Sequence, residues 1–305
     1  MSGLRVERST PLILLQDAGR FGSRHLGVTQ GGAADWISMG WANWLLGNDL
    51  DAAVLEITLG GLSLIVERDV CLALAGADLG ARLDDQPLQP WRSFVVRRGQ
   101  RLSFEQPLHG ARAYLAAPGG FDASPVLGSK ATVCREGLGG LDGNGQALVT
   151  GDLLDWSAPS PPARELSPAQ IPDLSPQRPL DTVLGAQIGD FAGQSLFDAF
   201  NSVWQVDARA DRMGIRLLGP ALEYQGRALI SEGIPLGAIQ VPPDGQPIVL
   251  LNDRQTIGGY PRLGALTPAA LARLAQCLPG TELRLTPVVQ ELAQQQQRAL
   301  LGQWA

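Results

Sequence analysis

Residues 53–75 read AVLEITLGGLSLIVERDVCLALA, in which 53–59, 62–67 and 70–75 are short β-prone or apolar runs. Short runs of this kind, bounded by turn residues, are typical of β-strands. The pattern continues at 101–104 and 111–117, and turns of the types GG, GAD, RRGQ and PGG lie between the runs. The 37 Gly and 22 Pro are spread along the chain as turn signals rather than repeats. The sequence therefore predicts a mainly β fold with a few short helices.

One helix is predicted in the first half, over residues 36–46, WISMGWANWLL. Asp35 can cap its start and Gly47 can end it in the left-handed conformation. Four apolar side chains recur at helical spacing and share one face: Ile37, Trp41, Trp44 and Leu45. We expect this face to pack in the core rather than to stack on a ligand.

A proline-rich stretch at 157–179, SAPSPPARELSPAQIPDLSPQRP, divides the chain. Its seven prolines remove amide donors and fix backbone angles, so it cannot be a central strand or a helix interior. We predict a first domain at 1–156, a connection at 157–179 and a second domain at 180–305. In the second domain, the predicted elements are strands at 228–230, 238–241, 248–251 and 282–285, a helix from Thr267-Pro268 to about 276, and a helical tail at 288–304.

A spaced motif, R-x-G-x-R-x-x-G, occurs from Arg20 to Gly27 and again from Arg212 to Gly219, each with an aspartate just upstream. Two copies of one β-barrel-like domain would leave such a repeat, although four fixed positions can also coincide by chance.

The charge, cysteine content and apolar runs of the chain argue against several classes of function. The net charge of -6 and the pI of about 5.0 argue against a nucleic-acid partner. The three cysteines (Cys71, Cys134 and Cys277) and two histidines form no metal-ligand spacing, so we assign no metal ligands and expect reduced thiols. No signal peptide or membrane-length apolar run is evident, and we predict a cytoplasmic protein.

Three polar segments are candidate sites, because no standard catalytic motif occurs. Residues 16–27 place Asp17, Arg20, Arg24 and His25 among three glycines, which suits either an anion site or a glycine-rich turn. Residues 253–261, DRQTIGGYP, follow the apolar run IVLLN, and polar residues at a strand end favour a site over a plain turn. Glu232 and Gln240 lie beside apolar runs in the third segment.

Glu56 and residues 136–145 can each be interpreted as structural or as functional. Glu56, inside AVLEITL, needs a partner if it is buried, and it is either a structural ion-pair member or a base with a raised pKa. Residues 136–145, EGLGGLDGNG, form either a mobile surface loop or an amide nest for an anion.

The motifs QDAGRFGSRHLG, WANWLLGN, LEITLGG, GADLGARLD, LAAPGGFD, ADRMG and GAIQVPPDGQPIVLLNDRQTIGGYP occur in this order over nearly the whole chain. Together they resemble the family of the 5-oxoprolinase C subunit, also described as the carboxyltransferase subdomain A and B family. That family includes the antagonist of a sporulation kinase inhibitor and part of urea amidolyase. The chain departs from the family pattern at Leu184-Gly185-Ala186-Gln187, where the family has LPGPQ, and such a change would alter the rim of a pocket.

The resemblance implies two tandem cyclophilin-like β-barrel subdomains and, as partners, the 5-oxoprolinase subunits B and A. It also implies ATP-dependent opening of 5-oxoproline to glutamate, with ATP as the phosphate source and Mg²⁺ left open. The residues carried over as catalytic are Glu232, Asp253 and Gln255, with Glu232 and Asp253 in acid–base chemistry or Mg²⁺ binding. The residues carried over as binding substrate or nucleotide are Asp17, Arg20, Arg212, Gly214, Gln240, Arg254 and Tyr260.

Two other functions fit the same resemblance. One is half of a biotin-dependent carboxyltransferase of the urea carboxylase type, which would need a biotin carrier and a biotin carboxylase. The other is a non-enzymatic regulatory partner of a kinase-inhibitor-like protein.

Overall fold

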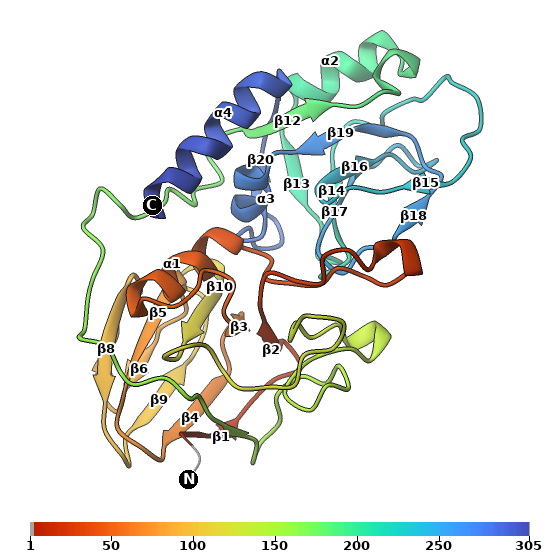
Figure 1. The fold of residues 1–305 in the computed structure, drawn as a ribbon. Helices are drawn as coiled ribbons and strands as arrows, with labels where there is room; N and C mark the ends of the chain where they lie inside the picture. Colours follow the sequence, from red (N-terminus) through yellow and green to blue (C-terminus); the bar gives the residue numbers. More distant parts are fainter. Residues whose placement is uncertain (1–2, 305) are drawn as a thin grey trace. The chain divides into compact units, whose positions relative to one another are not determined.

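The computed structural model describes residues 3–304 and separates into two compact units. The first unit comprises the chain up to Ser23 together with Gln30–Asp173. The second comprises Arg24–Thr29 and the chain from Leu174 onward. Figure 1 traces both units in sequence colours. The second unit therefore includes six residues from near the start of the chain, which the predicted boundaries did not anticipate.

The first unit contains two antiparallel sheets. One has the strand order β11-β1-β4-β9-β6-β7 and the other β2-β3-β10-β5-β8. The strands are β1 (Leu4–Arg8), β2 (Ile13–Gln16), β3 (Val54–Thr58), β4 (Leu62–Val66), β5 (Val70–Asp78), β6 (Arg82–Leu83), β7 (Gln86–Pro87), β8 (Arg92–Val96), β9 (Arg101–Phe104), β10 (His109–Ala116) and β11 (Leu153–Leu154).

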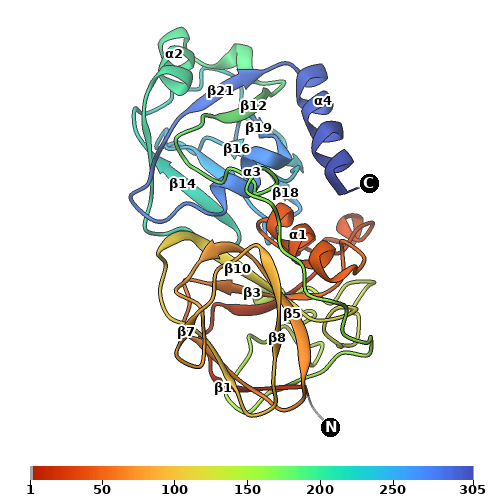
Figure 2. The ribbon, with the colours of Figure 1, turned by 90° about the vertical axis from the view of Figure 1, so that its left-hand side faces the viewer.

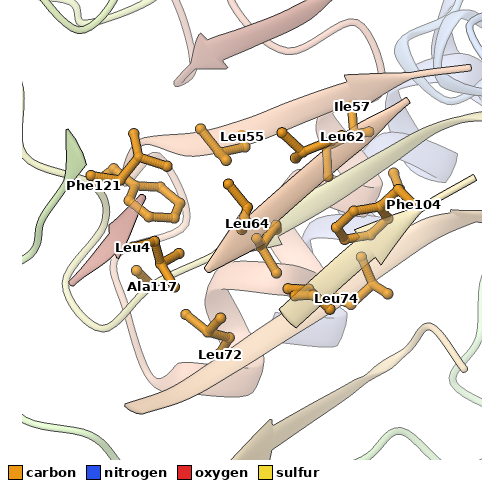
Figure 3. Close-up of a cluster of buried hydrophobic side chains, with 14 of the residues drawn as sticks. Leu4, Leu55, Ile57, Leu62, Leu64, Leu72, Leu74, Phe104, Ala117 and Phe121 are labelled. Carbon is orange, nitrogen blue, oxygen red and sulfur yellow. The ribbon is translucent and has the colours of Figure 1, made fainter. Parts of the chain in front are cut away.

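The core of this unit is built from the apolar runs that predicted the strands. Leu55 and Ile57 of β3, Leu62 and Leu64 of β4, and Phe104 of β9 are fully buried in one cluster (Figure 3). Alternate strand residues face the same side, so each run supplies two or three side chains to this cluster. Burial of apolar surface is the main stabilising contribution to such a unit.

Helix α1 (Trp36–Leu46) begins and ends at the predicted residues. The Asp35 carboxylate accepts hydrogen bonds from the amides of Ile37 (3.1 Å) and Ser38 (3.0 Å), and Gly47 has φ 69°, in the left-handed region. The helix packs on β5, β10 and β8. Of its predicted core face, Ile37, Trp41 and Leu45 are buried, whereas Trp44 is half-buried.

The second unit is organised by an eight-stranded sheet with the order β20-β13-β14-β17-β16-β19-β12-β21. Its two edge strands, β20 and β21, are separated in sequence by Arg284 alone, so the two edges meet and the sheet nearly closes into a barrel. A two-stranded sheet, β15-β18, accompanies it. The strands are β12 (Leu180–Leu184), β13 (Trp204–Val206), β14 (Gly214–Leu218), β15 (Glu232–Gly233), β16 (Ala238–Gln240), β17 (Ile248–Leu250), β18 (Ile257–Gly258), β19 (Arg262–Leu266), β20 (Glu282–Leu283) and β21 (Leu285–Val288).

Three α-helices complete the second unit. Helix α2 (Gly193–Asn201) packs against β21, α3 (Pro268–Leu274) packs against β12 and β19, and α4 (Gln290–Leu301) packs against β12 (Figure 2). Thr267 caps α3 and Pro268 occupies its first turn, as predicted. Short 3₁₀ helices occur at Arg24–Leu26, Cys134–Glu136, Ile188–Asp190 and Gly302–Trp304. Within residues 3–304 we find no helix with the length and apolar character needed to cross a membrane.

The structure confirms the mainly β fold with few short helices and corrects two details. The predicted strand at 228–230 is wrong: these residues form no strand, and Ile230 is 92% exposed, because an apolar run needs a hydrogen-bonding neighbour to become a strand. The two R-x-G-x-R-x-x-G copies also differ, since the first contains the 3₁₀ helix Arg24–Leu26 and the second enters β14. The boundary between the units falls after Asp173, inside the predicted connection.

Candidate functional site

Asp17 and Arg20 organise a loop of the first unit. The Asp17 carboxylate accepts hydrogen bonds from the Ser129 hydroxyl (2.6 Å) and the Lys130 amide (2.6 Å). Arg20 is 1% exposed, and its guanidinium donates to the carbonyls of Val126 (3.1 Å) and Ala131 (2.6 Å). These bonds hold the loop from 126 to 131. Their predicted part in binding substrate or nucleotide stays a prediction.

The segment Arg24–Thr29 brings an arginine to the second unit, where it meets Arg254. Arg24 Nη2 donates to the carbonyl oxygens of Ile234 and Thr256 (3.0 Å to Thr256). Arg254 Nε donates to the same Ile234 oxygen (3.2 Å). The Thr29 hydroxyl donates to the Arg254 carbonyl (3.4 Å). Two guanidinium groups therefore converge on one carbonyl oxygen.

The Arg24 and Arg254 guanidinium groups are both charged and both partly or fully shielded from water. Burial, and to a smaller extent the charge of Arg24, lowers the pKa of Arg254 to about 9. Burial also lowers the pKa of Arg24. Both guanidinium groups are still charged near neutral pH, so the pKa shifts express an unfavourable desolvation that a bound anion would relieve. Arg254 is 2% exposed, and its guanidinium donates to the carbonyls of Ile234 (3.2 Å) and Leu251 (3.2 Å), so its predicted part in binding substrate or nucleotide stays a prediction.

Asp253 and Arg212 form a two-bond ion pair in the second unit. Arg212 Nε donates to Asp253 Oδ2 and Arg212 Nη2 donates to Asp253 Oδ1, both at 3.0 Å. The Asp253 amide also donates to the Arg212 carbonyl (2.9 Å). Gly214 follows at the start of β14, where an added Cβ would lie 3.1 Å from the Val249 oxygen, so close strand packing accounts for this glycine.

Glu232 lies in β15 and faces the side chain of Arg262, which lies in β19. Arg262 Nη2 donates to Glu232 Oε1, and Arg262 Nη1 donates to the Gly233 carbonyl (3.1 Å). Gln187 Nε2 donates to the same Oε1 (3.1 Å). Both donors use one oxygen, and no group among residues 3–304 donates to Oε2. The Glu232 side chain is 49% exposed, so this second oxygen can accept a proton or a hydrogen bond from a ligand.

Gln240 and Gln255 lie next to Gly258 of β18. Gln240 is 3% exposed, and its Nε2 has no hydrogen-bond acceptor within the described chain. A Cβ on Gly258 would lie 2.9 Å from Gln240 Nε2 and 3.6 Å from Gln255 Nε2, so the glycine leaves room for both amides. An unpaired buried donor is costly, and such a group is commonly completed by a ligand or water. Tyr260, two residues further, is 48% exposed.

The candidate carboxylates do not form a metal site with one another. Asp253 is paired with Arg212 and Glu232 with Arg262. Across residues 3–304, no group of three or more His, Cys, Asp or Glu side chains is placed to hold a metal ion. These residues therefore do not fit a dedicated Mg²⁺ site, and we derive no step through one.

Glu56 takes the structural role of the two that the sequence left open. It is fully buried in β3, and its Oε2 accepts hydrogen bonds from Tyr114 Oη (2.8 Å) and the Ala34 amide (2.8 Å). Arg112 Nε lies 3.9 Å from its other oxygen. Burial and the Glu56 charge raise the pKa of Tyr114 well above its ordinary value, so this hydroxyl remains a donor. The cluster holds the chain just before α1.

Sequence reasoning did not select Arg262, named Gln187 only within the segment that departs from the family pattern, and named Arg24 without its partners. Arg24 was grouped with Asp17 and Arg20 because it is close in sequence, whereas it contacts residues more than 200 positions away. Arg262 and Gln187 lie outside the polar segments, and tertiary structure brings them from β19 and from the loop after β12 to Glu232.

Comparison with known proteins relates these residues to a family. The family model for the carboxyltransferase domain, subdomain A and B, matches residues 26–287. The chain is 40% identical to the 5-oxoprolinase C subunit of Escherichia coli, over 90% of this chain and 87% of that protein. It is thus similar to a protein named as one component of a 5-oxoprolinase.

Two solved structures have the same fold. The crystal structure of TTHA0988 matches with a TM-score of 0.84 and 37% identity, over 94% of this chain and 56% of that chain. The urea carboxylase of Kluyveromyces lactis matches with a TM-score of 0.90 and 27% identity, over 99% of this chain and 29% of that chain. The chain therefore spans little more than half of the first of these proteins and less than a third of the second. With the family model and the Escherichia coli relative in agreement, the chain belongs to the carboxyltransferase domain, subdomain A and B, family.

Proposed function

We propose that this chain is the C subunit of an ATP-dependent 5-oxoprolinase, which opens 5-oxoproline to glutamate together with subunits B and A and is inactive alone. The observation that carries the proposal is the similarity to the Escherichia coli 5-oxoprolinase C subunit, which extends over 87% of that protein. A match over nearly the whole of a separate protein favours the same role more strongly than a match to a minor part of a large enzyme.

The reaction has a chemical requirement that the second unit can meet. A lactam C–N bond is stabilised by resonance, so opening it at neutral pH needs activation of the carbonyl. Transfer of the γ-phosphoryl group from ATP to the lactam oxygen forms a C–O–P link and releases ADP. Water then attacks the ring carbon, the C–N bond breaks, nitrogen takes a proton, and a second water releases phosphate.

Each of these steps creates or moves charge, and the side chains described above could stabilise that charge or accept the proton. The Arg24 and Arg254 guanidinium groups would stabilise the negative charge of the phosphoryl group or the lactam oxygen. Glu232, through its open Oε2, would take the proton of the attacking water. Asp253 would hold Arg212 in place, and Gln240 and Gln255 would donate hydrogen bonds to the substrate.

The test is a reconstitution. The chain is purified with candidate subunits B and A, and ADP release is measured with and without 5-oxoproline. We expect 5-oxoproline-dependent release that requires this chain and that Arg24→Ala lowers about 100-fold, the size expected for loss of a preorganised charge-stabilising donor. Arg254→Ala should act in the same direction. Arg227→Ala, at an exposed arginine of the same unit, serves as the matched control and should retain turnover.

A stable complex without 5-oxoproline-dependent turnover would remove this function and favour a regulatory role. A second candidate is half of a biotin-dependent carboxyltransferase, which the likeness to Kluyveromyces lactis urea carboxylase over 99% of this chain favours. This function predicts urea-dependent ADP release that requires an added biotin carboxylase and its biotin carrier. Avidin, which binds biotin, should abolish the release.

A further inference from the structure

Residues 227–231, RALIS, lead into β15 and contain the run for which the sequence predicted a strand (Figure 1). Ile230 in this run is 92% exposed, more than any other large apolar side chain of residues 3–304. None of the five backbone amides donates a hydrogen bond to a group within residues 3–304. The segment therefore has the composition of a strand and lacks a neighbour that would satisfy its backbone.

One side of this segment is occupied and the other is open. β15 pairs with β18, with Glu232 opposite Gly258, and the two strands form a sheet of their own. On the same side, a Cβ on Gly259 would lie 3.3 Å from Ser231 Oγ and 3.4 Å from the Leu229 oxygen. Within residues 3–304, no strand pairs with the other edge of β15. An open edge with unpaired amides is a template for an added strand.

Exposed apolar side chains accompany the open edge. Ile257 of the paired strand β18 is 60% exposed, and Tyr260, just after that strand, is 48% exposed. With Ile230, they are three large side chains of this small sheet and its flanks that the second unit leaves uncovered. Covering such side chains with another chain is favourable, so an added strand would gain apolar contact as well as main-chain hydrogen bonds.

The charges of the segment indicate which strand fits. Residues 227–232 read RALISE, with a cation at one end and an anion at the other. When this stretch pairs antiparallel with a second copy of itself, Arg227 lies opposite Glu232 at both ends, and Leu229 lies opposite Ile230. The exposed Arg227 guanidinium has no partner within residues 3–304, and Glu232 Oε2 accepts no hydrogen bond there. Each copy thus supplies the charge that the other lacks.

We propose that two copies of this chain associate by antiparallel pairing of residues 227–232, about a two-fold axis between Leu229 and Ile230. Such a self-complementary surface is what a two-fold interface requires. Six paired residues on each side bury much less than the roughly 1,200–2,000 Å² of a stable interface, so the association is weak and reversible. Because the pairing covers Glu232 Oε2 with Arg227 of the second copy, its loss does not lower turnover. The inference does not depend on the proposed function.

The first test is sedimentation velocity of the full chain by itself over a wide concentration range. We expect a reversible monomer–dimer equilibrium, which Ile230→Asp should weaken at least about 10-fold by placing charge in the middle of the paired edges. Val289→Asp is the matched control at another exposed apolar residue of the second unit, 65% exposed, and should leave the equilibrium unchanged. Hydrogen exchange of backbone amides in residues 227–231 should slow at the concentrations at which the dimer forms.

A charge exchange gives the second test. Arg227→Glu and Glu232→Arg should each weaken the dimer at least about 10-fold, because like charges then face each other at both ends. An equimolar mixture of the two variants should restore it, since every cation again faces an anion. Misfolded variants could not give this restoration. A chain that stays monomeric, a dimer that Ile230→Asp leaves intact, or a mixture that does not associate would overturn the proposal. A monomeric chain whose complex with subunits B and A is lost in Ile230→Asp would assign the edge to another protein instead.

Discussion

Glu56 in the first unit and Glu232 in the second have the same local description and different surroundings. Each lies on a strand and faces an arginine of another strand: Arg112 of the paired strand β10 for Glu56, and Arg262 of β19, in a different sheet, for Glu232. Glu56 is fully buried and one of its oxygens receives both a backbone amide and a tyrosine hydroxyl. Glu232 is half exposed, with one oxygen open. The two glutamates therefore differ in what contacts the carboxylate: the Glu56 oxygens are enclosed by protein groups, and Glu232 keeps one oxygen accessible for the role proposed above.

The arginines repeat this contrast. Arg20 is buried among loop carbonyls of the first unit, whereas Arg262 lines a cavity and has a side chain that is 18% exposed. The Arg20 guanidinium donates to backbone carbonyls of one loop, whereas Arg262 donates to the Glu232 carboxylate as well as to the Gly233 carbonyl. The first unit therefore uses its buried charges for structure, and the second keeps some of them accessible.

The largest expected effect separates the two glutamates. Glu56→Ala should lower the free energy of unfolding by about 3–5 kcal/mol, because it removes the ion-pair partner of the buried Arg112 and the acceptor of Tyr114 and the Ala34 amide. Glu232→Ala should cost about 1 kcal/mol or less, since its pair is solvent-accessible. Urea-induced unfolding of both variants measures the difference, and similar losses would break the comparison.

The arginine pair gives the next largest effect. Arg20→Ala should cost about 2–4 kcal/mol, because buried carbonyls of the 126–131 loop lose a charged donor. Arg262→Ala should cost about 1 kcal/mol or less for the same reason as Glu232→Ala. Unfolding by urea again provides the measurement. A loss at Arg262 as large as that at Arg20 would mean that the second unit depends on its cavity edge for stability.

The smallest effect tests whether the Asp207 carboxylate, which is buried and paired with the exposed Arg209, stabilises the second unit through its charge. Arg209 donates to both oxygens of Asp207 and lowers the pKa of Asp207 to about 2. A carboxyl group with a lowered native pKa stabilises the fold above its ordinary pKa, near 3.8, and this contribution disappears as the pH falls through about 2. Asp207→Asn should therefore be less stable than the unchanged chain at pH 7, and the gap should narrow below about pH 4. A gap that is independent of pH would contradict this assignment.

Local signals in the sequence predicted much of the fold. Asp35, Gly47 and Thr267 mark helix ends because caps depend on residues only a few positions away. The strands at 53–75 were predictable for the same reason, since their apolar runs and turns are local. The run at 228–230 failed because nothing in its own composition reports the absence of a neighbouring strand.

The site was predictable only in part. The polar segment at 253–261 and Glu232 were identified because they follow or flank apolar runs. Arg24 could not be placed, because its partners Ile234 and Thr256 are distant in sequence. Nor could the sequence distinguish Glu56 from Glu232, since Ala34 and Gln187, which decide the difference, are brought in by tertiary structure.

The claim that the second unit carries the chemistry is tested most directly by 5-oxoproline-dependent ADP release per folded molecule in the reconstituted complex, measured for Glu232→Gln and Tyr114→Phe. We expect Glu232→Gln to lose about 100-fold or more in rate, as for removal of a general base, while its stability stays near that of the unchanged chain. Tyr114→Phe should lose stability and keep its rate, because its hydroxyl contacts Glu56 and the Asp35 amide, both in the first unit. Full turnover by Glu232→Gln, or loss of turnover confined to Tyr114→Phe, would contradict the claim.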